Sequence, residues 1–215
     1  MDNGGPYTNP DQEPAMQYPA FFDQIEPLVL RDPLAELLGA FADGVMQIHY
    51  LDVVRLAGHS CPTVAGAYLM ARKGMKVLYG SDMPVRGEIA VEMQQPIGEG
   101  VTGVIANVLS FITGATDKGG FHGLAGQFDR RNLLSFDKDN PAPVTLIRKD
   151  TGQRVSLVYD ASFIPADPLM GALFPKVLTG KASADEAKRF GVLWQGRVEA
   201  ILCEYADHPQ LVLIS

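Results

Sequence analysis

Two side chains that can ligate a metal ion stand two residues apart in the segment Gly58-His59-Ser60-Cys61-Pro62. Imidazole and thiolate are ligands that a borderline-soft ion such as zinc prefers. His59 and Cys61 can converge on one ion only in an extended or turn conformation, which Pro62 favours at the residue before it. A helix that restarts after Pro62 would also stabilise the Cys61 thiolate through its dipole. The structural alternative is a buried histidine beside a cysteine that packs as a small apolar side chain.

The glycine-rich segment from Thr116 to Gly126 supplies further candidates. His122 would add a third metal ligand to His59 and Cys61, and three ligands leave the open position of a catalytic metal. Lys118 would hold an anionic substrate or a cofactor carboxylate. In such an enzyme Cys61 and Lys118 would be the catalytic residues. The alternatives are a loop histidine bonded to backbone and a solvated lysine.

Haem is the second cofactor that these residues suggest. A Cys-Pro pair with a distant histidine is found in proteins whose haem iron is held by thiolate or imidazole, so Cys61 or His122 would be the axial ligand. Phe121 and the glycines near it leave room for a flat cofactor to approach the backbone. This hypothesis predicts a sensor, carrier or redox protein.

The composition argues against several classes of function. The 215 residues carry a net charge of -7, with 47% hydrophobic and 20% charged residues. A chain of this charge, without a cluster of Lys and Arg, is not expected to bind nucleic acid or an anionic membrane surface. No stretch approaches the roughly 20 apolar residues of a membrane span. Phosphate-binding loops, dinucleotide fingerprints and serine-hydrolase elbows are also missing from the sequence.

Cysteine usage and the first residues favour a cytoplasmic location. Cys61 and Cys203 are too few for a disulfide framework, which predicts free thiols. Residues 1–19 are polar and rich in Pro, Gly, Asn and Asp, which predicts a flexible tail and not a secretory signal. Residues 20–215 are expected to form one domain.

The first half of the domain is expected to be mainly helical. Asp32 and Pro33 are a typical N-cap and first residue of a helix, and apolar residues recur from there to Leu56. A break near Asp43 and Gly44 would divide this run into two helices. The other expected elements are a helix over 64–73 capped by Gly74, a strand over 77–79, a strand over 88–93, and a helix over 100–113 ended by Gly114.

The second half predicts a β-hairpin followed by helices. Residues 144–149 and 154–159 are separated by the turn 150–153. A helix over 168–178 and another from Ser183, which begins a capping box, to about Ala206 follow, with Cys203 in the core. An edge strand over 211–214 ends the chain. This order predicts an α+β fold, with a small, mostly antiparallel sheet covered by helices.

Two segments resemble motifs of the FmdE family, which is named after formylmethanofuran dehydrogenase. The first, AGHSCPTVAGAYLMA (57–71), resembles its His-Gly-His-x-Cys-Pro-Gly motif. The second, ANVLSFITGATDKGG (106–120), resembles Asp-Ala-Ile-Gln-x-x-Thr-Gly-Cys-Thr-x-Gly-Lys-Gly. The resemblance implies a family core over about 52–159 with helical extensions at both ends, including 160–215. The resemblance also implies a homodimer. It implies a cleft that binds a transition metal, often zinc, through His59 and Cys61. Lys118 matches the lysine of the second family motif.

Several positions depart from the family pattern. Ala57 stands at the first histidine, Val104 and Ala115 at cysteines, and Asn107 at an aspartate. A closed four-ligand zinc site cannot be built from the matched positions. Three hypotheses follow: a metal-dependent protein or enzyme with an open His/Cys site, a haem-binding protein, and a metal-free interaction module. A small-molecule ligand or cofactor is the expected partner, and the sequence names no substrate.

Overall fold

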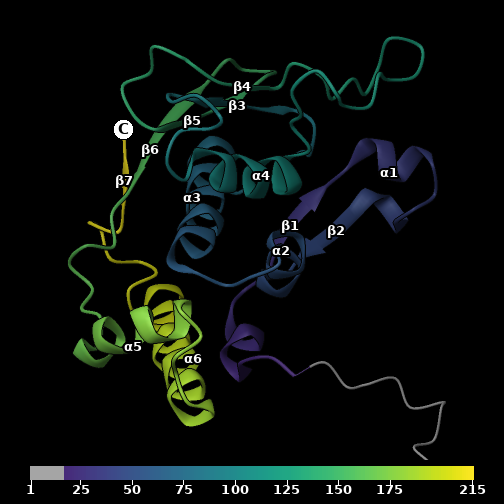
Figure 1. Cartoon of the computed structure of the whole chain (residues 1–215). Helices are drawn as coiled ribbons and strands as arrows, with labels where there is room; N and C mark the ends of the chain where they lie inside the picture. The colour runs from purple at the N-terminus through teal and green to yellow at the C-terminus, as the bar shows by residue number, and fades with distance from the viewer. Residues whose placement is uncertain (1–16) are drawn as a thin grey trace, which may run out of the picture.

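The computed structural model describes residues 17–215, so most of the predicted tail lies outside the described residues (Figure 1). Its main sheet has the strand order β4-β3-β5-β6-β7, and only the β3–β4 pair is parallel. A separate two-stranded sheet pairs β1 with β2. The predicted α+β class and the mostly antiparallel sheet are confirmed. The strands are β1 (Leu28–Arg31), β2 (Val45–Ile48), β3 (Ile89–Met93), β4 (Leu134–Ser135), β5 (Val144–Arg148), β6 (Arg154–Tyr159) and β7 (Val212–Ile214).

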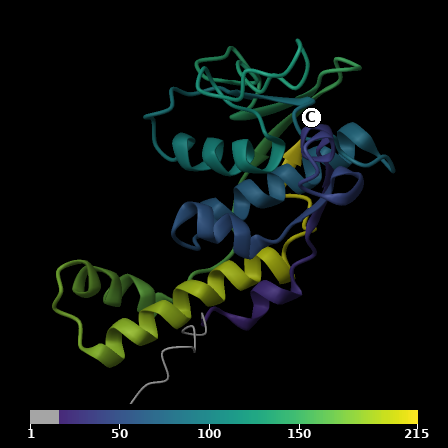
Figure 2. The same cartoon turned by 90° about the vertical axis from the view of Figure 1, so that its right-hand side faces the viewer.

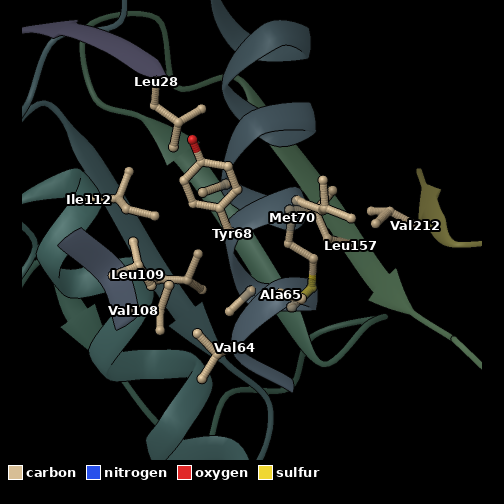
Figure 3. Close-up of a cluster of buried hydrophobic side chains, with 14 of the residues drawn as sticks. Leu28, Val64, Ala65, Tyr68, Met70, Val108, Leu109, Ile112, Leu157 and Val212 are labelled. Carbon is tan, nitrogen blue, oxygen red and sulfur yellow. The ribbon is translucent and has the colours of Figure 1, made fainter. Parts of the chain in front are cut away.

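Helices α3 (Pro62–Tyr79) and α4 (Thr102–Thr113) lie against the main sheet (Figures 1 and 2). The buried face of α3 packs against α4 and β6, and α4 also packs against β3, so that burial of apolar side chains stabilises the fold. The strands supply alternating buried positions, as in β3, whose register opposes Val91 to Leu146 of β5. Figure 3 shows part of this core, including Val64, Ala65, Tyr68, Val108, Leu109, Ile112 and Leu157.

Helix α3 is longer than the sequence pattern indicates. The predicted helix end at Gly74 and the predicted strand over 77–79 are wrong, because the helix continues to Tyr79 and is capped by Gly80. A Cβ atom at Gly74 would lie 2.6 Å from Leu146 Cδ1 and 2.9 Å from Leu157 Cδ1. This glycine therefore permits close packing of helix on sheet, and it does not end the helix.

The same close approach occurs nearer the start of α3, at Gly66, and yields a testable prediction. A Cβ atom there would lie 2.5 Å from Cε1 of the Tyr159 ring. Gly66→Ala is expected to lower the free energy of unfolding by about 1–3 kcal/mol, because overpacking outweighs the better helix propensity of alanine. Urea unfolding measures the change.

The matched control is Gly191→Ala in helix α6 (Ala184–Glu199), where a Cβ atom meets nothing within 4 Å. There the substitution is expected to raise stability by about 0.5–1 kcal/mol. Equal stabilisation by both substitutions would show that Tyr159 does not constrain α3.

The predicted pair of helices over 33–56 is only partly present. Helix α1 (Pro33–Leu37) and helix α2 (Tyr50–Ala57) form, with Asp32 as the predicted N-cap of α1. The helix predicted over 45–48 is wrong, since these residues form β2. Asp43 and Gly44 have positive φ angles of 54° and 66° and reverse the chain, so that β2 pairs antiparallel with β1. Tertiary pairing here overrides the local apolar spacing.

The C-terminal helices lie together at one end of the molecule (Figure 2). Helix α5 (Pro168–Leu178) and the Ser183 capping box of α6 are confirmed. A π-helical turn (Ala200–Glu204) extends α6, and short 3-10 helices occupy Ala20–Gln24 and Ala42–Gly44. Cys203 is exposed, so its predicted place in the core is wrong. The π turn changes the angular position that an α-helix would give this residue.

Candidate functional site

A cavity of about 510 Å³ opens between α1, α2, α4 and the segment that follows α4. One face of α4 forms its wall, because Val104, Val108 and Phe111 are spaced at three to four residues. Polar groups from other elements reach the same space. Among the described residues the lining holds no aspartate or glutamate, and it consists of Leu34, Leu56, Ala57, His59, Arg86, Val104, Asn107, Val108, Ser110, Phe111, Gly114, Thr116, Phe121 and Arg130.

The two arginines of the cavity share one carboxylate, that of Asp32. Arg86 Nη1 donates to Asp32 Oδ2 at 2.8 Å, and Arg130 Nη2 donates to Oδ1 at 2.7 Å. Oδ1 also accepts from the backbone N–H of Leu34 at 3.0 Å, because Asp32 is the N-cap of α1. Asp32 and Arg130 are buried, with 4% and 5% of their surface exposed. Two cations on one anion leave the cluster with a net positive charge.

The backbone around the cluster explains how the arginines are placed. Arg86 Nη2 donates to the carbonyl of Phe111 at 3.1 Å, near the C-terminus of α4, where a cation is favoured. Gly114 follows α4 in the left-handed conformation, and a Cβ atom there would lie 2.7 Å from Arg130 Nη1. At Gly87 the corresponding distance would be 1.9 Å. These two glycines make the space that the Arg130 guanidinium occupies.

The ion pairs keep Asp32 ionised despite its burial. Burial alone would raise the pKa of Asp32, but the hydrogen bond from Arg86 and the charge of Arg130 outweigh it, so the pKa lies below its usual value. For Arg130, burial lowers the pKa, while Asp32 raises it and Arg86 lowers it. A carboxylate that accepts several charged hydrogen bonds is a stable anion at neutral pH.

Of the predicted site residues, only His59 and Phe121 line the cavity. His59 Nδ1 lies 2.9 Å from the carbonyl oxygen of Ala57. Because a carbonyl only accepts, Nδ1 carries the hydrogen in the neutral ring. Nε2 makes no hydrogen bond within residues 17–215, so it can accept one or ligate. Phe121 is 41% exposed at the edge of the cavity.

The other predicted residues lie elsewhere. Cys61 has the predicted extended conformation (φ -148°, ψ 168°) and is the N-cap of α3, where its Sγ accepts from Val64 N at 3.5 Å. Lys118 and His122 are exposed in the loop and do not line the cavity. Within residues 17–215, no group of three or more His, Cys, Asp or Glu side chains is placed to hold a metal ion. His59, Cys61 and His122 therefore do not form the three-ligand metal site that the sequence predicts.

Sequence reasoning missed Asp32 as a site residue, and it missed Arg86 and Arg130 altogether. The sequence marks Asp32 only as a helix cap, and the arginines come from loops far apart in the chain. The glycines that make room for Arg130, Gly87 and Gly114, are visible in the sequence, but their role there depends on contacts that only the fold creates.

Comparison with known proteins identifies the fold family. The family model FmdE, described as "FmdE, Molybdenum formylmethanofuran dehydrogenase operon", matches residues 56–209 of the 215. This confirms the resemblance seen in the two motifs, and the match continues beyond them into the C-terminal helices. No curated protein matches the chain. In the part of the chain that the structure describes, no helix has the length and apolar character needed to cross a membrane.

Proposed function

Since the chain belongs to the FmdE family, we propose that it binds an organic small molecule in the cavity beside α4, without a metal held by the predicted ligands. The observation that supports this proposal is the cavity itself. Its volume of about 510 Å³ falls within the roughly 300–1,000 Å³ typical of ligand sites. An apolar wall with a few convergent polar groups is also typical of such sites.

The polar groups in the cavity are suited to orienting a ligand. Asn107 and Ser110 lie three residues apart on α4, on the face that lines the cavity. His59 supplies its Nε2 ring nitrogen from the segment between α2 and α3, and the arginines supply donors. The apolar wall would hold the body of the ligand, and these groups would select its orientation.

A transition metal and haem, the two cofactors expected from the sequence, have less support in the cavity lining than an organic ligand has. Cys61 and His122, the predicted axial ligands of haem and partners of His59 in a metal site, do not line the cavity. The proposal therefore assigns no chemical step to a metal or to haem. A Soret band in the purified protein, shifted by His122→Ala, would restore the haem hypothesis in place of this one.

The test uses N-phenylnaphthylamine, a neutral dye whose fluorescence rises in apolar surroundings. Val104→Trp fills the cavity from α4, and it is expected to weaken dye binding about tenfold or more, since the dye loses its buried contacts. Fluorescence titration of both proteins measures the affinity, and circular dichroism verifies that the variant is folded.

The matched control is Val192→Trp, which changes the same residue type on the exposed face of α6. Val192 is 57% exposed and borders a second apolar hollow between α6 and the 3-10 helix Ala20–Gln24. This variant is expected to bind the dye as the natural protein does. Loss of binding in Val192→Trp, or no change in Val104→Trp, would contradict the proposal and favour the interaction-module hypothesis.

A further inference from the structure

Resting on the proposed function, we infer that the ligand of this cavity is an organic monocarboxylate with an apolar body, and that Arg86 and Arg130 bind its carboxylate. The inference concerns the chemical class of the ligand, which neither the family match nor the cavity volume specifies. Its evidence is the excess positive charge of the two arginines in the cavity lining, and a buried arginine nitrogen that has no hydrogen-bond partner among the described residues.

The first step is the charge of the cluster. Asp32 neutralises one of the two arginines. Glu88 is near enough to influence Arg130, but it is paired with Lys149 at 3.2 Å. In residues 17–215, no acidic side chain lines the cavity. One positive charge therefore remains uncompensated beside an apolar wall. The electrostatic attraction between this charge and a bound anion is stronger there than it would be in water.

The second step is the number of donors. The Asp32 oxygens already accept from both arginines and from backbone N–H groups of α1. Arg130 Nη1 is buried, and it has no hydrogen-bond partner among the residues that the structure describes. A buried guanidinium nitrogen without a partner costs free energy, and Nη1 makes no bond to Asp32, whose Oδ1 accepts three hydrogen bonds and whose Oδ2 accepts one, from Arg86. Arg86, whose side chain is 25% exposed, is the guanidinium that a carboxylate in the cavity reaches directly, and a small shift of the Arg130 side chain would bring the buried Nη1 to the same anion.

The third step separates this site from a purely structural ion pair. A structural cluster that links α1 to α4 needs one arginine for Asp32 and one bond to the Phe111 carbonyl, and Arg86 alone makes both. Arg130 adds a second cation at the cavity wall, and two glycines with positive φ make room for it. Guanidinium groups bind planar carboxylates through paired N–H donors, and the single spare charge matches one carboxylate.

The experiment is displacement of N-phenylnaphthylamine from the natural protein by three naphthyl compounds of similar size. These are naphthoate, the neutral naphthylmethanol and the cationic naphthylmethylamine. Naphthoate is expected to bind about 10- to 100-fold more tightly than naphthylmethanol, the range of a charge-assisted hydrogen bond, and the amine is expected to bind most weakly. Naphthyl phosphate is expected to bind no more tightly than naphthoate, since its second charge has no partner.

A variant pair assigns the effect to the cluster. Arg86→Gln removes one guanidinium that is 25% exposed, and it is expected to weaken naphthoate about tenfold and naphthylmethanol much less, because the alcohol loses a neutral hydrogen bond and no charge pairing. The control Arg31→Gln removes an exposed arginine paired with Glu36 and should change neither affinity. Unfolding curves verify that both variants are folded.

The outcomes separate the two proposals. If naphthylmethanol displaces the dye as well as naphthoate does, or naphthyl phosphate binds more tightly, the carboxylate inference is wrong and the proposed function stands. If the dye does not respond to Val104→Trp, the cavity is not a ligand site and both fail. Because the comparison of probes uses the natural protein, an unfolded Arg86→Gln variant would not remove the test.

Discussion

Asp32→Asn is expected to lower the free energy of unfolding by about 3–5 kcal/mol, the cost of removing one partner from a buried ion pair. Asparagine caps a helix about as well as aspartate, so the start of α1 is preserved. The loss comes from Arg86 and Arg130, which are left near each other without a counter-charge. Urea unfolding at neutral pH measures the change.

The control for this prediction is Asp167→Asn at the start of α5. Asp167 is also an N-cap followed by proline, and its side chain accepts from Leu169 N at 2.8 Å, but it is exposed and has no arginine partner among the described residues. The expected change is only about a few tenths of a kcal/mol. Similar losses in both variants would mean that helix capping, and not the ion pairs, accounts for the effect.

The Asp32 prediction has a pH dependence whose sign follows from the lowered pKa. A carboxyl group whose pKa is lower in the folded protein stabilises the fold above its unfolded pKa, about 3.9 for aspartate. That contribution is lost as the pH falls through the lower folded value. The stability difference between the natural protein and Asp32→Asn should therefore be constant near neutral pH and should shrink below about pH 4. A constant difference down to the lowest measurable pH would contradict the role of ionised Asp32.

Gly114→Ala is expected to be the second most damaging of these changes, with a loss of about 2–5 kcal/mol. Gly114 has φ 74°, and an alanine in this conformation costs about 1–2 kcal/mol. Its Cβ atom would also lie 2.7 Å from Arg130 Nη1 and 3.1 Å from Arg86 Cγ. The arginine ends cannot move aside without breaking their bonds to Asp32, which adds an overpacking cost of about 1–3 kcal/mol.

Gly58 is the matched control for Gly114. It also ends a helix, α2, in the left-handed conformation, with φ 73°, but a Cβ atom there meets nothing within 4 Å. Gly58→Ala is therefore expected to lose only the conformational cost of about 1–2 kcal/mol. Thermal and urea unfolding of both variants measure the difference, and naphthoate affinity should fall only in Gly114→Ala. If the two variants lost the same stability and Gly114→Ala bound naphthoate as the natural protein does, the result would show that Gly114 does not constrain the arginine cluster.

Local sequence signals determined much of the fold. Asp32 before Pro33, the capping box at Ser183 and Gly114 after α4 each depend on residues close by in the chain, so their physical meaning is readable without the tertiary structure. The β-hairpin followed likewise from two apolar runs and a short turn. The two motifs also identified the family correctly.

Only the tertiary structure decided the rest, because the deciding contacts join residues distant in the chain. By its local sequence Gly74 is a typical helix end, but it lies inside α3, where it allows close contact with β5 and β6. Residues 45–48 likewise have the apolar spacing of a helix, but they form a strand that pairs with β1. No periodicity or motif in the sequence predicts that Arg86 and Arg130 both bind Asp32. Spacing along a chain records local geometry, whereas a cavity and its uncompensated charge arise only when separate segments are packed together.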